Sequence, residues 1–144
     1  MVKKRKAKEP TIRTPVIPAD RRGLHFSFRY LQMDHPRFPI ADCTAEFFCA
    51  LFREIHRYQT FSVDQFKDPN PDEHRHPITW SETHEPKGFP HINPTRDETW
   101  TDDPWQFGLP CANKADPSRL WRVHGFITDG AFYIVWLDPL HKLD

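Results

Sequence analysis

Aromatic and polar residues alternate where the folded part of the chain is expected to begin. Over residues 25–30 every second residue is aromatic, namely Phe26, Phe28 and Tyr30. Because alternate side chains of a strand lie on the same face, this pattern predicts a half-buried strand with the three rings on one side. The two prolines within residues 34–39 are expected to end the strand.

The next segment repeats apolar residues at intervals of three and four, which is the spacing of an amphipathic helix. We expect Asp42 to cap this helix and Tyr58 to lie at its end. The apolar stripe predicted to face the core consists of Phe47, Phe48, Leu51, Ile55 and Tyr58. Ser62 and Gln65 follow with the spacing of a capping box, which predicts a second, short helix over residues 63–67.

Two segments rich in β-branched and aromatic residues, 120–127 and 131–137, predict a β-hairpin near the end of the sequence. Asp129 and Gly130 lie between them. This dipeptide favours a two-residue type I′ turn, because both central positions of that turn need a positive φ.

The register set by this turn assigns the hairpin side chains to two faces. Val123 is expected opposite Trp136, and both are expected on an entirely apolar face. The other face is predicted to carry Arg122, His124 and Phe126, beside Leu137, Val135 and Tyr133 respectively. The side chains of Arg122, His124 and Tyr133 are therefore predicted within reach of one ligand.

Residues 68–110 hold eight of the fifteen prolines and four histidines, which predicts a long Pro- and His-rich loop. Within it we expect at most short strands at 78–80 and 105–109. The elements together predict an α+β fold with a single small domain, residues 24–144. In this fold an N-terminal strand and helix pack on an antiparallel sheet that ends in the C-terminal hairpin.

The charged residues are unevenly distributed, although 20 Lys and Arg balance 20 Asp and Glu over the 144 residues. Residues 1–23 hold eight basic and two acidic residues, a net charge of +6, so the other 121 residues carry −6. We expect an unfolded basic tail, which is either a solubilising leader or an electrostatic arm for nucleic acid or an acidic protein partner. The candidate nucleic-acid-binding residues are Lys3, Lys4, Arg5, Lys6 and, in the long loop, Arg75.

Composition and short motifs exclude several classes of protein. No run of about 18 apolar residues offers a membrane span, and no apolar segment follows the basic N-terminus as in a secretory leader. The three cysteines are an odd number without CxxC spacing, which favours a reducing, cytoplasmic setting. The chain has five glycines and no GxSxG, P-loop or GxGxxG motif, so serine-elbow hydrolases and nucleotide-cradling enzymes are not expected.

The polar face predicted for the hairpin suits cleavage of a phosphodiester in RNA. One group would remove the 2′-hydroxyl proton, another would protonate the leaving 5′-oxygen, and an arginine would neutralise the charge that builds on phosphorus. We assign proton transfer to His124, phosphate stabilisation to Arg122 and positioning to Tyr133. His76 and His141 are further catalytic candidates. This chemistry needs no metal and no cofactor. In the structural alternative, Arg122 pairs with a carboxylate and His124 forms hydrogen bonds across the sheet.

A metal-assisted enzyme is a third possibility, because four histidines lie within eighteen residues of the long loop. They are His74, His76, His84 and His91. Their spacing fits no standard zinc site, since the chain has no His-Glu-x-x-His motif and no cysteine pair. The prolines also prevent a helix from presenting ligands one turn apart. We therefore expect no physiological metal site.

The order of the predicted elements resembles that of the RelE/ParE-like toxins of bacterial toxin–antitoxin pairs, over roughly residues 24–144. RelE-like members cut messenger RNA on the ribosome without a metal, and ParE-like members poison gyrase. The resemblance implies a toxin-like endoribonuclease that acts on RNA, on the ribosome in one version, and has an antitoxin-like protein partner. Arg122, His124 and Tyr133 match in kind the residues that RelE-like nucleases place on their last strands.

The chain also departs from those toxins, which are normally shorter and strongly basic. This domain is acidic without its tail and has an extra loop of about forty residues. The C-terminal stretch from Arg122 to His141 looks like that of uncharacterised bacterial proteins. A competing class therefore stays open: a non-catalytic nucleic-acid- or protein-binding module of a toxin–antitoxin or defence system, with the hairpin face as an interface.

Overall fold

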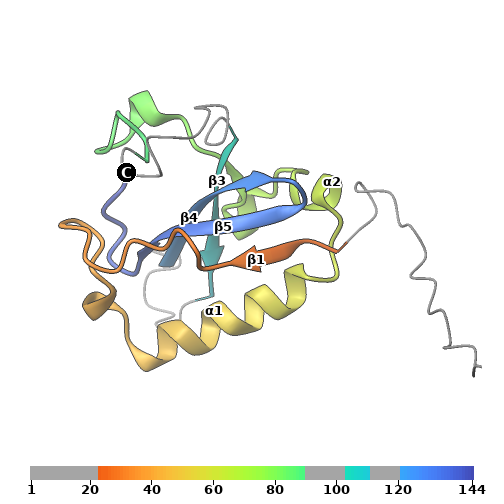
Figure 1. The fold of residues 1–144 in the computed structure, drawn as a ribbon, viewed down its shortest axis with the longest axis horizontal. Coiled ribbons are helices and arrows are strands. Elements are labelled where there is room, and N and C mark those ends of the chain that lie inside the picture. Colours follow the sequence, from red (N-terminus) through yellow and green to blue (C-terminus); the bar gives the residue numbers. More distant parts are fainter. Residues whose placement is uncertain (1–22, 90–102, 111–120) are drawn as a thin grey trace, which may run out of the picture.

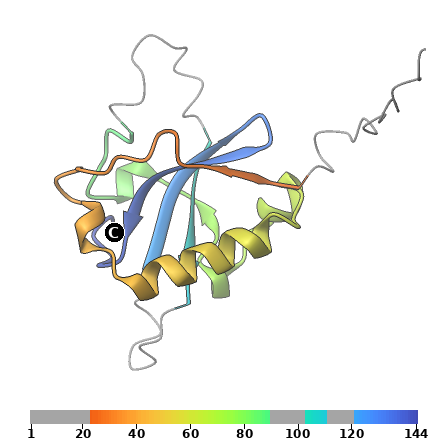
Figure 2. The same cartoon turned by 60° about the horizontal axis from the view of Figure 1, so that its bottom comes forward.

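The computed structural model describes residues 23–89, 103–110 and 121–144. Its helices and strands are β1 (His25–Ser27), α1 (Ala45–Tyr58), α2 (Val63–Phe66), β2 (His76–Pro77), β3 (Pro104–Leu109), β4 (Trp121–Thr128) and β5 (Ala131–Asp138). The five strands form one sheet in the order β1-β5-β4-β3-β2. Helix α1 lies along one face of this sheet (Figure 1 and Figure 2). The predicted α+β class is confirmed.

Helix α1 presents the predicted apolar stripe to the sheet. The buried residues of the stripe are Phe47, Leu51, Ile55 and Tyr58. Phe48 is half-buried against the same core. The cap is Thr44 rather than Asp42, because the Thr44 hydroxyl accepts a hydrogen bond of 3.2 Å from the backbone N–H three residues on. Asp42 instead ends a 3-10 turn. The capping box of Ser62 and Gln65 forms at α2 as predicted.

Strand β1 is shorter than predicted, and it pairs in parallel with β5. The sheet is therefore mixed, whereas we expected an antiparallel sheet. β1 ends at Ser27, whose hydroxyl accepts a hydrogen bond from the backbone N–H of Arg29. The turn that follows separates the three aromatic residues. Phe26 packs in the core beneath α1, Phe28 is 42% exposed, and Tyr30 packs on the opposite face of the sheet.

The β4–β5 hairpin has the predicted two-residue turn. Asp129 and Gly130 have φ angles of 50° and 77°, as a type I′ turn requires. The predicted register holds from this turn as far as the pair formed by Gly125 and Ile134.

A one-residue β-bulge changes the register beyond that pair. Val135 is the extra residue on β5, so Trp136 lies opposite His124. Trp136 consequently packs on the face away from α1, and its predicted place beside Val123 was wrong. Asp138 now lies opposite Arg122. The bulge therefore adds an indole and a carboxylate to the face that carries the predicted site.

A second hydrophobic core covers this face of the sheet. Its buried residues are Phe38, Ile78, Phe89, Phe126, Val135, Trp136 and Leu143. Segments before α1, after β2 and after β5 contribute to it, so the centre of the face is enclosed by loops. Strand β3 matches the strand predicted at 105–109, whereas the one predicted at 78–80 is not formed. Pairing occurs at β2, just before it, and Trp80 begins a 3-10 turn.

Within the described ranges, no helix is both long enough and apolar enough to cross a membrane.

Candidate functional site

His124 and Asp138 form a buried hydrogen-bonded pair in the centre of the predicted polar face. Nε2 of His124 lies 3.2 Å from Oδ2 of Asp138, and the two side chains are 0% and 1% exposed. The His124 ring lies against Phe38 and Trp136, with ring centroids 5.9 and 6.4 Å away. None of the described residues offers a hydrogen-bond partner to Nδ1 of His124. A substrate therefore cannot touch His124 while the second core is closed.

The surroundings of this pair determine its protonation. Burial lowers the pKa of His124, although the hydrogen bond with Asp138 opposes the change. Burial tends to raise the pKa of Asp138, but the hydrogen bond with His124 and those from the backbone N–H groups of Lys142 and Leu143 hold it below its ordinary value. At neutral pH the pair is therefore a neutral imidazole, protonated at Nε2, and a carboxylate.

The low pKa of His124 should make the protein less stable in acid. Below about pH 6.5 the unfolded chain binds a proton on this histidine that the folded state does not, so the free energy of unfolding falls as the pH drops. The expected contribution is at most about 1.4 kcal/mol per pH unit. We expect His124→Gln, which keeps a donor for Asp138 but cannot titrate, to reduce this slope. Urea unfolding from pH 7.5 to 5.5 measures it, and equal slopes for the two proteins would contradict the assignment.

Arg122 lies opposite Asp138 in the sheet and forms a hydrogen bond with the loop that precedes β2. Its Nη2 donates a hydrogen bond of 3.1 Å to Nδ1 of His74. Because a guanidinium only donates, the proton of the neutral His74 ring is on Nε2. Burial, followed by the positive charge of Arg122, lowers the pKa of His74, and His76 and His141 act in the same direction. Arg122 itself is 3% exposed.

His74 is hydrogen-bonded to Arg122, and His76 and His141 are close enough to influence His74 electrostatically, so we call His74, His76, His141 and Arg122 the histidine cluster. His74 and His141 both have left-handed backbone, with φ of 49° and 55°. Such strained backbone is concentrated at functional sites in proteins. His76 is exposed on the edge strand β2, where its Nε2 lies 2.8 Å from the side-chain amide nitrogen of Gln106. His141 is half-buried.

Tyr133 is not brought to the histidine cluster. It lies opposite Phe126 and stacks on that ring at 5.1 Å, with Tyr30 on another side at 5.3 Å. On this face of β4, Phe126 follows His124 and lies closer to the hairpin turn. Tyr133 therefore belongs to an aromatic group near the turn of the hairpin, opposite Phe126, whereas Arg122 lies at the other end of β4, opposite Asp138.

Arg75 is also engaged inside the protein. It is 5% exposed, and its guanidinium donates hydrogen bonds to the backbone carbonyls of Phe66 and Asp68 at 2.8 and 2.9 Å. It also forms an ion pair with Glu73 and lies 5.6 Å from the centre of the Tyr58 ring. Arg75 ties the segment before β2 to the core beneath α1, so in this structure it is not presented to nucleic acid.

The remaining sequence candidates lie outside the described residues. They are Lys3, Lys4, Arg5 and Lys6 of the tail, together with His91. Among the residues that are described, no group of three or more His, Cys, Asp and Glu side chains is arranged to hold a metal ion.

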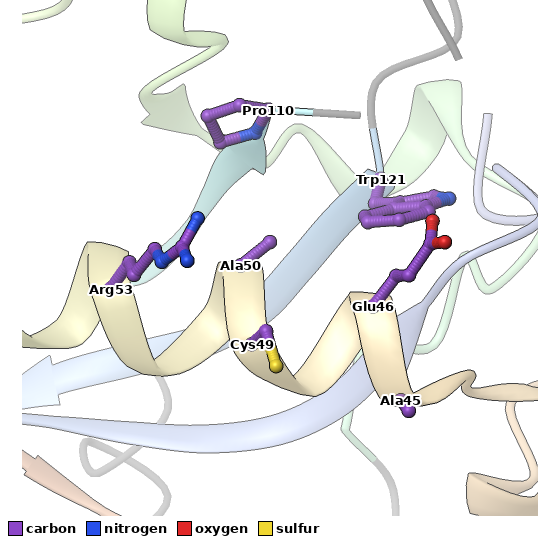
Figure 3. Close-up of a pocket in the computed structure, with 7 residues that line it drawn as sticks. All are labelled: Ala45, Glu46, Cys49, Ala50, Arg53, Pro110 and Trp121. Carbon is purple, nitrogen blue, oxygen red and sulfur yellow. The ribbon is translucent and has the colours of Figure 1, made fainter. Parts of the chain in front are cut away.

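Two hollows open near the ends of β3 and β4. One, of about 350 Å³, lies on the α1 side of the sheet (Figure 3). It is lined by Ala45, Glu46, Cys49, Ala50, Arg53, Pro110 and Trp121. The other, of about 360 Å³, is lined by Glu54, Arg57, Asp72, Glu73, Gly108 and Pro110. No member of the histidine cluster lines either hollow, and the second hollow is lined in part by Glu54 and Arg57 of α1.

Two members of this site, His74 and Asp138, were not assigned to it from the sequence. His74 lies in a Pro-rich loop without a periodic pattern, and its sequence setting suggested only a metal ligand. Asp138 reaches the site because of the bulge at Val135. An Ile-Val-Trp run fits a strand with or without a bulge, so no signal in the sequence marked the change of face.

A comparison with protein-family models, curated proteins and solved structures found no match to this chain.

Proposed function

We propose that this domain cleaves RNA without a metal and that the histidine cluster is its active site. One observation carries the proposal: His74 accepts a hydrogen bond from the buried Arg122 and has its pKa lowered by burial and by the charge of Arg122. A neutral imidazole held against a fixed positive charge is suited to bind the oxygens of a phosphate. Perturbed pKa values and strained backbone at one place favour a functional role.

The reaction would be a transesterification within the RNA strand. The 2′-oxygen attacks phosphorus, the bond to the 5′-oxygen breaks, and the products carry a 2′,3′-cyclic phosphate and a 5′-hydroxyl. His141 accepts the 2′-hydroxyl proton, and His76 donates a proton to the leaving oxygen after its ring leaves its hydrogen bonds with the Pro77 carbonyl and the Gln106 amide. The Nε2–H of His74, supported by the charge of Arg122, stabilises the negative charge that builds on the phosphate oxygens.

This proposal redistributes the roles predicted from the sequence. His76 and His141 take the proton transfers first assigned to His124, and Arg122 keeps its electrostatic role. His124 contributes through its hydrogen bond with Asp138, and Tyr133 contributes to packing. A RelE-like relationship, a cytoplasmic location and an antitoxin-like partner belong to the proposal through resemblance and composition. The basic tail would supply the attraction for RNA or the ribosome that an acidic domain lacks.

A cleavage assay in EDTA tests the proposed function. We expect the full chain to cut RNA and to leave 2′,3′-cyclic phosphate ends, and His141→Ala to lower the rate by about 10²-fold or more. His56→Ala is the matched control, since His56 is exposed on α1, at the other face of the sheet. Equal rates for the two variants, or cleavage that EDTA abolishes, would exclude the proposed site.

A non-catalytic binding domain is the second candidate. The burial of Arg122 and His124 favours it, because buried polar groups often serve to fix a fold. If the wild-type chain binds RNA or a protein but cuts no RNA under any of these conditions, this second function replaces the first.

A further inference from the structure

The carboxylate of Asp138 closes a turn of the chain directly after β5. Its Oδ1 accepts a hydrogen bond of 2.8 Å from the backbone N–H of Lys142. Its Oδ2 accepts one of 3.0 Å from the backbone N–H of Leu143 and is also hydrogen-bonded to His124. One buried side chain thus holds three groups, two of them in the segment that follows β5.

His141 lies inside this closed turn. The residues after it are fixed on a second side as well, because the backbone N–H of His84 donates to the Leu143 carbonyl at 2.7 Å. The Leu143 side chain is buried in the second core with Trp136. His141 itself adopts the left-handed φ of 55° that the turn imposes. Its placement therefore depends on the hydrogen bonds that close the turn around it.

We propose that Asp138 is a positioning residue, which fixes the turn that carries His141, and that His124 acts on the site by orienting the Asp138 carboxylate. The inference rests on the proposed function, because it names what holds the proton-accepting histidine in place. It also gives a role to the bulge at Val135, which turns Asp138 toward this face of the sheet.

A carboxylate is needed at this position, and an amide is not equivalent. Oδ2 of Asp138 faces two donors, the Leu143 N–H and His124 Nε2. In Asp138→Asn one of the two oxygens becomes an NH₂ group, which only donates. To accept from it, His124 would have to move its proton to Nδ1, which lies among Phe38 and Trp136 and has no partner among the described residues. The variant therefore weakens the turn even though its shape is conserved.

Asp138→Asn tests the inference against a matched variant, Val123→Ala. Val123 is fully buried beside His124 but points into the core beneath α1, and its truncation also costs stability. We expect Asp138→Asn to lower kcat about 10²-fold, since small misplacements of reacting groups cost this much. Val123→Ala should keep kcat. KM should change by less than about threefold in both, because substrate binding is not the affected step.

Two further measurements do not depend on activity. Hydrogen exchange at the Lys142 and Leu143 amides should accelerate in Asp138→Asn and not in Val123→Ala. The NMR signal of the His141 imidazole should move in Asp138→Asn and stay in place in Val123→Ala. In the kinetic assay, His124→Gln, which keeps a donor for Asp138, should retain more activity than His124→Phe.

The outcomes separate this inference from the proposed function. If wild type cuts no RNA, the proposed function fails, and the exchange and imidazole measurements still decide whether Asp138 places His141. If wild type cuts RNA but Asp138→Asn and Val123→Ala have the same kcat, the positioning role is overturned. An unchanged His141 signal in Asp138→Asn overturns it as well.

Discussion

Replacing Arg122 with methionine is expected to leave the domain folded and to lower the rate of RNA cleavage by about 10²–10³-fold. Methionine has a similar length and no charge, but Asp144 and Asp138 attract the Arg122 guanidinium, and removing one partner of a buried charged pair is destabilising. Asp138 keeps its three hydrogen bonds in this variant, because none of them comes from Arg122. The free energy of unfolding is nevertheless expected to fall by up to about 3 kcal/mol, because the buried Asp138 carboxylate loses the positive charge beside it.

The titration of His74 provides the readout that a purely structural arginine would not affect. The charge of Arg122 is one cause of the lowered pKa of His74, after burial. Its removal should raise that pKa, which NMR titration of the imidazole measures. Arg122→Lys keeps the charge and serves as the control, with a smaller change in pKa and an intermediate rate. Cleavage at the wild-type rate by a folded Arg122→Met protein would remove Arg122 from the site.

Replacing Gly125 with alanine is expected to destabilise the fold by about 3 kcal/mol or more. A Cβ at this position would overlap the carbonyl oxygen of Tyr133 and lie 2.5 Å from the Phe132 ring. Gly125 lies directly next to the bulge, at a point where β4 and β5 approach closely. The backbone of β5 is paired with β1 on one side and β4 on the other, and the Phe132 ring is buried, so neither can move away and the hairpin would have to separate. Chemical unfolding measures the loss.

Gly130→Ala is the contrasting variant in the same hairpin. A Cβ there would have no neighbour within 4 Å, but the backbone φ is 77°. The cost is then the strain of a left-handed alanine alone, about 1–2 kcal/mol. An equal loss for the two variants would show that close packing at Gly125 is not what limits the hairpin.

The elements that the sequence predicted correctly depend on residues close together in the chain. The stripe of α1, the capping box at Ser62 and the turn at Asp129 and Gly130 each need only a few neighbouring positions. The predictions were wrong where the structure depends on contacts between segments that are far apart in the chain. The parallel pairing of β1 with β5 has no local signature, and the bulge at Val135 depends on how the second core packs on Trp136.

The candidate site was predicted in part for the same reason. Arg122 and His124 share a face because they are two residues apart on one strand, and this part of the register does not depend on the hairpin partner. Tyr133 lies opposite Phe126 as predicted, but it stacks on that ring and lies nearer the hairpin turn than Arg122 and His124. His74 reaches the site because the loop before β2 turns at its left-handed backbone, and no hydrophobic pattern in the sequence predicts that turn.

The pairing of β1 with β5 also has a consequence for the order of assembly during synthesis. Residue 25 pairs with residue 131, and β5 lies between β1 and β4 in the sheet. Strand β5, which joins β1 to the rest of the sheet, therefore leaves the ribosome last among the five strands. Until it does, the apolar stripe of α1 lacks much of its binding surface, and closure of so long a segment is slow. We expect the nascent chain to depend on chaperones during this interval.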